Sequence, residues 1–265
     1  MSRFATMFDR LAARDQHAFV PFCVLGDPSP DETLPILLAL CDGGADALEL
    51  GIPFSDPVAD GPTIQAAAGR ALDAGTRPQD AFAIIARLRE TQADIPIGLL
   101  VYANLLEARG MDHFYRHAHA AGVDAILVAD VPTAEAAPYL KSAAANGIDP
   151  VMIATPNASD DELETIASMS RGFTYVVSRK GVTGTTVTAG TGHHTVVRQL
   201  ASYGAPPALI GFGISTPEHV RSACSSGAAG AISGSAVVRL IASAQGETRQ
   251  RALRDFVSEM KQATR

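Results

Sequence analysis

Short apolar runs alternate with amphipathic stretches along the whole chain. Each apolar run has the length of a buried strand, and each stretch between two runs has the apolar spacing of one helix face. The expected strands cover 19–24, 45–50, 97–102, 125–129, 150–154, 174–177, 208–211 and 229–233. The expected helices cover 31–42, 62–74, 78–92, 107–121, 134–146, 160–170, 193–202, 217–226 and 235–244.

This alternation predicts a single (β/α)8 TIM barrel. Strands that alternate with helices form right-handed βαβ units and a parallel sheet, and eight units fit a closed barrel better than an open sheet. We expect an extra N-terminal helix over 2–14 that caps the barrel bottom, and additional helices after strands 2 and 8, the last over 247–261. The 265 residues contain no linker or low-complexity tract, so we expect one domain over 1–265.

A weak internal repeat of glycines supports the barrel. Gly44, Gly122 and Gly147 each stand two residues before an Asp, ahead of a strand, and Gly227 begins a degenerate copy. Each lies where a helix must stop and turn back to the sheet, a position that favours positive φ. The interval from Gly44 to Gly122 is 78 residues for two units, against 25 residues for the one unit from Gly122 to Gly147, because an extended loop and an extra helix follow the second strand.

Charge and cysteine content narrow the function classes. The formal net charge of −7 argues against a nucleic-acid or membrane-surface binder. The three cysteines, Cys23, Cys41 and Cys224, are far apart and form no C-x-x-C pair, which predicts reduced thiols and neither a disulfide framework nor a zinc site. We find no apolar run long enough to span a membrane and no signal peptide, so we expect a cytoplasmic protein.

Glu49 is the first candidate for chemistry. Along the strand, Ala47 and Glu49 share one face while Leu48 and Leu50 share the other, so Glu49 should point into the barrel near its top. A buried carboxylate costs several kcal/mol unless it is paired or protonated. A proton-carrying catalytic group explains its presence; a structural ion pair is the alternative.

Two further carboxylates, Asp56 and Asp60, follow in a loop that is stiffened by Pro53, Pro57 and Pro62. Loop aspartates commonly cap the helix that follows, here the one expected near Pro62. Their position shortly after a buried Glu shifts the interpretation toward function.

Glycine-rich turns at the ends of the last two strands predict a phosphate site. Gly211 to Ile214 end strand seven, and Ser233 to Ala236 end strand eight and begin a helix. In many barrels these loops and a helix N-terminus bind phosphate through backbone N–H groups. Tight turns required only by geometry are the alternative.

The segment 178–194 is long, polar and rich in Gly and Thr, which predicts a lid over the barrel mouth that is not ordered without ligand; a surface loop is the alternative. His113 and His117 have helical spacing without the acidic residue of a zinc protease, so we expect no metal site. There is no P-loop and no Gly-x-Ser-x-Gly elbow.

The stretch 48–61, LELGIPFSDPVADG, resembles the signature of the tryptophan synthase alpha subunit family. The likeness extends in order over essentially the whole chain. It includes Pro21-Phe22, Gly26-Asp27-Pro28, GPTIQ at 61–65, YAN at 102–104, ADVP at 129–132, SR at 178–179, GVTG at 181–184, GFGI at 211–214 and GSA at 234–236.

The resemblance implies a lyase of tryptophan biosynthesis that cleaves indole-3-glycerol phosphate to indole and glyceraldehyde 3-phosphate by a retro-aldol reaction. It implies Glu49 as the group that protonates indole C3 and then accepts the C3′ hydroxyl proton, and Asp60 as the acceptor of the indole N–H. The expected indole pocket consists of Phe22, Leu100, Leu127, Tyr175, Thr183 and Ile232, with Thr183 closing over Asp60. The expected phosphate contacts are Gly184, Phe212, Gly213, Gly234 and Ser235.

The resemblance also implies no cofactor and no metal in this chain. The family pairs with a pyridoxal-phosphate β subunit in a linear αββα assembly, and 53–58 with the segments around Asn104 and Pro132 would contribute to that contact. One segment departs from the family: after Gly184 the chain reads TTVTAGTGHH and lacks the charged residues and prolines common there. We expect this to affect the motion of the lid and its coupling to the partner.

Two other functions stay open. The chain could act mainly as an allosteric partner subunit with weak activity alone, although Glu49 and Asp60 argue against this. It could also be a sugar-phosphate isomerase on a related barrel, but that activity calls for a polar pocket, whereas Phe22, Leu100 and Leu127 predict an apolar one.

Overall fold

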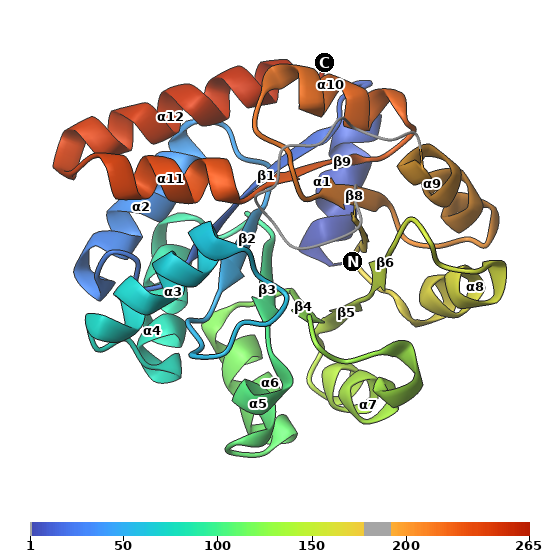
Figure 1. Ribbon diagram of the computed structural model, residues 1–265, viewed down its shortest axis with the longest axis horizontal. Coiled ribbons are helices and arrows are strands. Elements are labelled where there is room, and N and C mark those ends of the chain that lie inside the picture. Colours follow the sequence, from blue (N-terminus) through green and yellow to red (C-terminus); the bar gives the residue numbers. More distant parts are fainter. Residues whose placement is uncertain (1, 178–191) are drawn as a thin grey trace.

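A parallel sheet closes into a barrel at the centre of the computed structural model, which describes residues 2–177 and 192–265. The strand order is β5-β4-β3-β2-β1-β9-β8-β7-β6, and helices surround it (Figure 1). The strands are β1 (Ala18–Val24), β2 (Leu48–Gly51), β3 (Ile97–Val101), β4 (Ala125–Val128), β5 (Asp149–Val151), β6 (Ile153–Ala154), β7 (Thr174–Val177), β8 (Ala208–Gly211) and β9 (Gly230–Ser233). The predicted fold class is confirmed.

The fifth expected strand is divided into β5 and β6 at Met152. Its first part pairs with β4, with Val151 opposite Leu127, and its second part pairs with β7, with Ile153 opposite Tyr175. The ring therefore closes through the backbone of Met152, whose carbonyl accepts a hydrogen bond from the Tyr175 N–H at 3.0 Å.

The helices follow the expected order. They are α1 (Arg3–Ala12), α2 (Pro30–Asp42), α3 (Pro62–Asp73), α4 (Pro78–Thr91), α5 (Ala103–Glu107), α6 (Met111–Ala121), α7 (Ala137–Ala145), α8 (Asp160–Met169), α9 (Gly192–Ser202), α10 (Pro217–Ser225), α11 (Ser235–Ser243) and α12 (Gly246–Gln262), with a 3-10 turn η1 (Thr133–Glu135) before α7. No helix among them is long and apolar enough to cross a membrane, as far as the structure describes the chain.

One helix prediction is wrong. The segment 107–121 is not continuous, because α5 ends at Glu107 and α6 begins at Met111. Gly110 lies between them with a φ of 90°, a backbone conformation that a helix cannot contain. The glycines of the internal repeat behave as expected: φ is 98° at Gly44, 94° at Gly122, 68° at Gly147 and 91° at Gly227.

Two apolar clusters separate the inside of the barrel from its outside. Leu48 and Leu50 belong to the cluster between the strands and the surrounding helices, whereas Ala47 belongs to the cluster inside the barrel. The expected alternation along β2 is therefore correct, and it directs Glu49 inward. Inside the barrel the apolar side chains of the second cluster pack together, and a cavity opens at the carboxyl ends of the strands.

Helix α1 closes the lower end of the barrel, as the sequence predicts. Phe4, Met7, Phe8 and Leu11 lie in the interior cluster, and the ring of Phe4 is 5.0 Å from that of Phe173, centroid to centroid.

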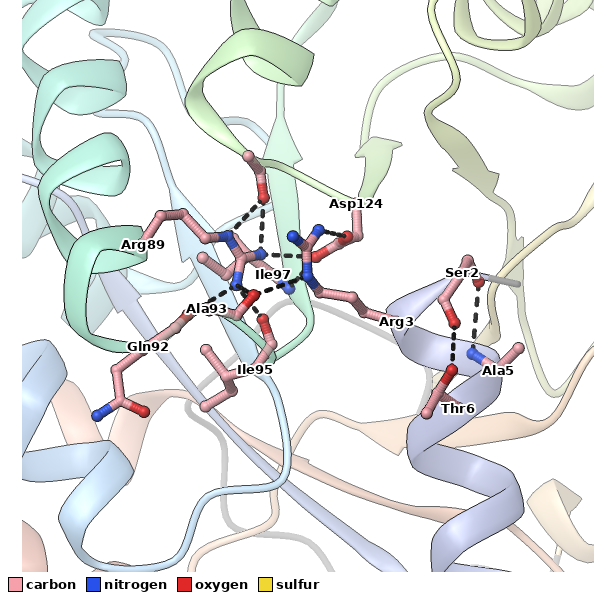
Figure 2. Close-up of polar contacts among 11 residues, drawn as sticks. Ser2, Arg3, Ala5, Thr6, Arg89, Gln92, Ala93, Ile95, Ile97 and Asp124 are labelled. Carbon is pink, nitrogen blue, oxygen red and sulfur yellow. Dashed lines mark hydrogen bonds and ion pairs between the residues drawn. The ribbon is translucent and has the colours of Figure 1, made fainter.

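Ion pairs to buried carboxylates lie at this closed end. Figure 2 shows Arg3 from α1 and Arg89 from α4 directed at Asp124, which precedes β4. The two guanidinium groups lie 2.8 and 2.7 Å from the Asp124 carboxylate, which also accepts the backbone N–H of Ile97 at 2.8 Å. Asp124 is therefore a structural carboxylate.

Candidate active site

A cavity of about 200 Å³ opens at the carboxyl ends of the strands. Its walls come from β1, β2, β3, β7 and β9, from the loop before α3, and from the turns that lead into α10 and α11. Chain segments far apart in sequence meet here because parallel strands present all their carboxyl ends at one face of the barrel. Of the predicted residues, Phe22, Glu49, Asp60, Leu100, Tyr175, Phe212, Gly213, Ile232, Gly234 and Ser235 line it.

Glu49 is the buried carboxyl group of the cavity. It is 3% exposed and stands opposite Phe22 on β1 and Gly98 on β3. Within the described part of the chain, no hydrogen bond or ion pair reaches its carboxyl group. Burial raises the pKa of Glu49 to about 8, and the negative charge of Asp60 adds to the effect. Among the described residues, Glu49 therefore has no partner of the kind that the structural alternative, a buried ion pair, requires.

Asp60 lines the same cavity from the loop after β2. Its Oδ2 accepts a hydrogen bond from the Tyr102 hydroxyl at 2.7 Å. Burial raises the pKa of Asp60, and the hydrogen bond from Tyr102 opposes that rise by stabilising the charged form. The ring of Tyr102 is itself stacked on Phe54, with centroids 5.4 Å apart, so the donor is held in place.

Neither loop aspartate caps α3. The N-cap residue is Gly61, and no side-chain oxygen satisfies the first N–H groups of the helix. Asp56 is exposed and accepts only the hydroxyl of its neighbour Ser55 at 2.5 Å. The two carboxylates therefore differ: Asp60 faces the cavity, whereas Asp56 is not among the residues that line it.

Apolar side chains form the wall around the two carboxyl groups. Phe22, Tyr175 and Ile232 are each at most 5% exposed, and Leu100 completes the wall. Leu127 is also inside the barrel, at 1% exposed, and is the neighbour of Leu100 across β3 and β4. The sequence places it in the indole pocket, but it is not among the residues that line the cavity.

The opposite end of the cavity consists of glycine-rich turns. Phe212 and Gly213 both have left-handed φ values, 68° and 76°, so the chain turns sharply after β8. For Phe212 this conformation costs about 1 kcal/mol, a strain often found at functional sites. The Ser233 hydroxyl donates to the Ile214 carbonyl at 2.7 Å and joins this turn to the end of β9.

Helix α11 begins at this end of the cavity. Its N-cap residue is Gly234, no side chain caps it, and its first turn contains no acidic residue. The N–H groups of that turn are therefore available to an anion, which the helix dipole also favours.

Thr183 and Gly184 lie outside the described residues, as does the predicted lid up to residue 191. Among the residues that the structure describes, no group of three His, Cys, Asp or Glu side chains is arranged to hold a metal ion.

Comparison with known proteins assigns the family. The sequence of residues 8–265 matches the family described as tryptophan synthase alpha chain. The tryptophan synthase alpha chain of Vibrio cholerae is 50% identical over 267 residues, covering 100% of both chains. The chain belongs to the tryptophan synthase alpha chain family.

Solved structures of tryptophan synthase have the same fold as this chain. Tryptophan synthase subunit alpha from Legionella pneumophila superposes with a TM-score of 0.88 at 29% identity, covering 100% of this chain and 98% of that one. A structure of the tryptophan synthase a2b2 complex from the hyperthermophile Pyrococcus furiosus gives a TM-score of 0.82 at 36% identity, covering 92% and 98%.

Membership confirms the activity expected from the sequence. A tryptophan synthase alpha chain is a lyase of tryptophan biosynthesis that cleaves indole-3-glycerol phosphate to indole and glyceraldehyde 3-phosphate. An isomerase of sugar phosphates is excluded at the level of the family.

Several side chains of this tryptophan synthase alpha chain site are not among the predicted site residues, and three of them are polar: Tyr102, His219 and Arg239. The sequence places Tyr102 at the end of a strand and in the family likeness but gives it no role, and it gives His219 and Arg239 none, yet all three contact Asp60 or line the cavity. Arg239 could have been found from its position one helical turn after Ser235. His219 gives no comparable signal, because its position depends on the path of the turn after β8.

Proposed function

We propose that the cavity is the site of the lyase reaction, with Glu49 as the group that carries the proton. The observation that supports this proposal is a buried, unpaired carboxyl group whose pKa is raised to about 8 beside apolar walls that fit an indole ring. A general acid works best when its pKa lies near the operating pH.

The proton would move in two steps. Protonated Glu49 gives its proton to indole C3, and the ring nitrogen takes up the positive charge. The Glu49 carboxylate then accepts the proton of the C3′ hydroxyl while the bond between C3 and C3′ breaks and its electron pair returns to the ring. Indole and glyceraldehyde 3-phosphate leave, and Glu49 is protonated again.

Asp60 would stabilise the charge that develops in the first step. An anionic acceptor for the indole N–H interacts more strongly with the charged ring than with the neutral substrate, which lowers the barrier. The hydrogen bond from Tyr102 supports this assignment, because it favours the ionised form of Asp60.

The substrate phosphate would lie at the turns of Phe212, Gly213, Gly234 and Ser235, with Thr183 and Gly184 contributing from the segment outside the described residues. The uncapped N-terminus of α11 supports this placement. The apolar wall around Glu49 and Asp60 is then left for the indole ring.

No cofactor enters this scheme, since the protonated indole ring itself accepts the electron pair. We assign pyridoxal phosphate to a partner β subunit, with which this chain would form an αββα tetramer in the cytoplasm. The mutual activation of the tryptophan synthase a2b2 complex from Pyrococcus furiosus supports the pairing. Phe54, Pro57 and the exposed Val58 would contribute to the contact.

The test is release of indole from indole-3-glycerol phosphate by the purified chain. The chain contains no Trp, so the fluorescence of the indole product can be followed without a tryptophan background. We expect turnover by the wild type and loss of turnover in Glu49→Gln with an unchanged circular dichroism spectrum. Wild-type turnover in the variant would remove Glu49 from the mechanism.

The same assay with added β subunit separates the enzyme from the allosteric partner. Measurable turnover by the isolated chain supports the lyase role. Turnover that persists in the complex when Glu49 is replaced would instead mean that this chain acts only on its partner.

A further inference from the structure

Two side chains at the phosphate end of the cavity have no part in the mechanism above. His219 from α10 and Arg239 from α11 both line the cavity beside Gly213, Gly234 and Ser235. We propose that His219 and Arg239 bind the phosphate group of the substrate together with the backbone N–H groups, and so select phosphorylated ligands. This proposal rests on the proposed function of the cavity.

The hydrogen bonds of His219 define which ring nitrogen carries its proton. The backbone N–H of Ser215 donates to Nδ1 at 3.3 Å, so Nδ1 presents its lone pair. In the neutral ring the proton is then on Nε2, because the two nitrogens share one proton. No residue of the described chain accepts a bond from Nε2, which leaves it as a donor for a ligand.

The backbone around His219 holds the ring at the cavity. Its own N–H donates to the Oγ1 of Thr216, the N-cap residue of α10, at 3.4 Å. His219 is half-buried, unlike the first-turn residue Glu218, which is exposed and pairs with Arg221 on the surface of the helix. Glu218, the acidic residue of this turn, therefore forms its ion pair on the helix surface and not in the cavity.

Arg239 supplies the positive charge. It lies one helical turn after Ser235 on the same face of α11, so it faces the turn whose N–H groups are open. Among the described cavity-lining residues it is the only lysine or arginine, and within the same part of the chain no carboxylate forms an ion pair with it. The ionisable carboxyl groups that line the cavity, Glu49 and Asp60, are acidic, so among the described lining residues Arg239 supplies the positive charge for an anionic ligand.

With His219 and Arg239, the site should prefer phosphorylated ligands more strongly than the backbone N–H groups of the turns would by themselves. Backbone N–H groups bind many anions, whereas a guanidinium and an imidazole N–H add charge and direction. Because Arg239 is exposed, we expect a salt-dependent contribution of modest size.

The experiment compares the affinity of two ligands, indole propanol phosphate and indole, measured by ligand fluorescence at low and high salt. Arg239→Gln should weaken binding of indole propanol phosphate by about fivefold at low salt and less at high salt, with binding of indole unchanged within about twofold. Arg239→Lys should recover most of the loss.

Variants of His219 test the donor. His219→Leu should weaken binding of indole propanol phosphate by about fivefold, and His219→Gln, which keeps an N–H near the position of Nε2, should weaken it less. Arg221→Gln is the matched control, because it removes the same charge from the outer surface of α10. We expect it to bind both ligands like the wild type.

Equal losses for both ligands in Arg239→Gln, or a loss of the same size in Arg221→Gln, would overturn the proposal. So would unchanged affinity for indole propanol phosphate in both Arg239→Gln and His219→Leu. These outcomes are distinct from failure of the proposed function, which would show as absence of indole release by the wild type whatever the ratio of the two affinities.

Discussion

Buried carboxylates at the two ends of the barrel have opposite surroundings: those at the closed end are paired, and the one at the open end is not paired within the described residues. At the closed end, Asp124 accepts two guanidinium groups and a backbone N–H, and Asp46 accepts the Phe19 N–H at 2.9 Å and Lys261 at 2.8 Å. At the open end, Glu49 is more buried than either, at 3% exposed, and among the described residues it has no ion-pair partner, whereas the like charge of Asp60 lies nearby.

This difference in pairing distinguishes the structural carboxylates from the proposed catalytic one, Glu49, better than the size of the space around each group. The hollow beside Asp46 and Arg10 at the closed end, about 420 Å³, is larger than the cavity at Glu49. The buried carboxylate of that hollow, Asp46, is however already paired with Arg10 and Lys261. Burial without a partner destabilises the charged form of a carboxyl group and so raises its pKa. A raised pKa is the property that a general acid needs.

The largest expected effect separates activity from stability at the open end. Glu49→Gln should lower kcat by about a thousandfold, because it removes the proton donor and acceptor. Its free energy of unfolding should equal or exceed that of the wild type, since a buried group with no partner is replaced by a neutral one. Steady-state kinetics and urea unfolding of the same preparation measure both. A clear loss of stability would mean that Glu49 has a structural partner.

The closed end should behave in the reverse manner. Asp124→Asn leaves Arg89, whose side chain is 11% exposed, without its counter-ion and should lower the free energy of unfolding by about 3 kcal/mol. The activity of the folded fraction should stay within a few-fold of the wild type. Arg221→Gln, at an exposed ion pair, is the control and should cost less than about 1 kcal/mol. If Asp124→Asn were as stable as this control, the contrast between the two ends would be lost.

The pH dependence of stability sharpens the same contrast. Because the pKa of Glu49 rises from its ordinary 4.5 to about 8 on folding, the folded state holds a proton that the unfolded state releases between these values. The contribution of this proton is fully present below pH 4.5 and is lost as pH rises through about 8. Stability of the wild type relative to Glu49→Gln should therefore fall across this window, by at most about 1.4 kcal/mol per pH unit.

Urea unfolding of both proteins at several pH values checks this, and groups common to both cancel in the difference. A difference that did not change with pH would mean that Glu49 titrates normally. The rate should follow the same group, with kcat/KM declining above about pH 8 as Glu49 loses its proton.

The residues that the sequence predicts best are those whose position follows from local periodicity. The direction of Glu49 follows from alternation along one strand, and the turn glycines from where helices must end, so both were predictable. The break between α5 and α6 is marked in the sequence by Gly110, but the apolar spacing continues across this glycine and therefore predicts a single helix.

Other features depend on neighbours that are distant in sequence. The division at Met152 arises because the two halves of one strand pair with different strands. The bond from Tyr102 to Asp60 joins two loops 42 positions apart, and no pattern within either loop indicates it.

That bond gives the smallest effect and the most specific one. Tyr102→Phe keeps the ring stacked on Phe54 and removes only the donor to Asp60. We expect kcat/KM to fall by about tenfold, the effect of one hydrogen bond to a charged group. Because the bond lowers the pKa of Asp60, its loss should move the acidic limb of the kcat/KM profile to higher pH.

Tyr139→Phe, which removes a phenol hydroxyl bonded to Glu107 outside the cavity, is the matched control and should leave both the rate and the profile unchanged. A rate loss in Tyr102→Phe without a shifted acidic limb would show that Tyr102 supports the shape of the cavity and not the charge of Asp60.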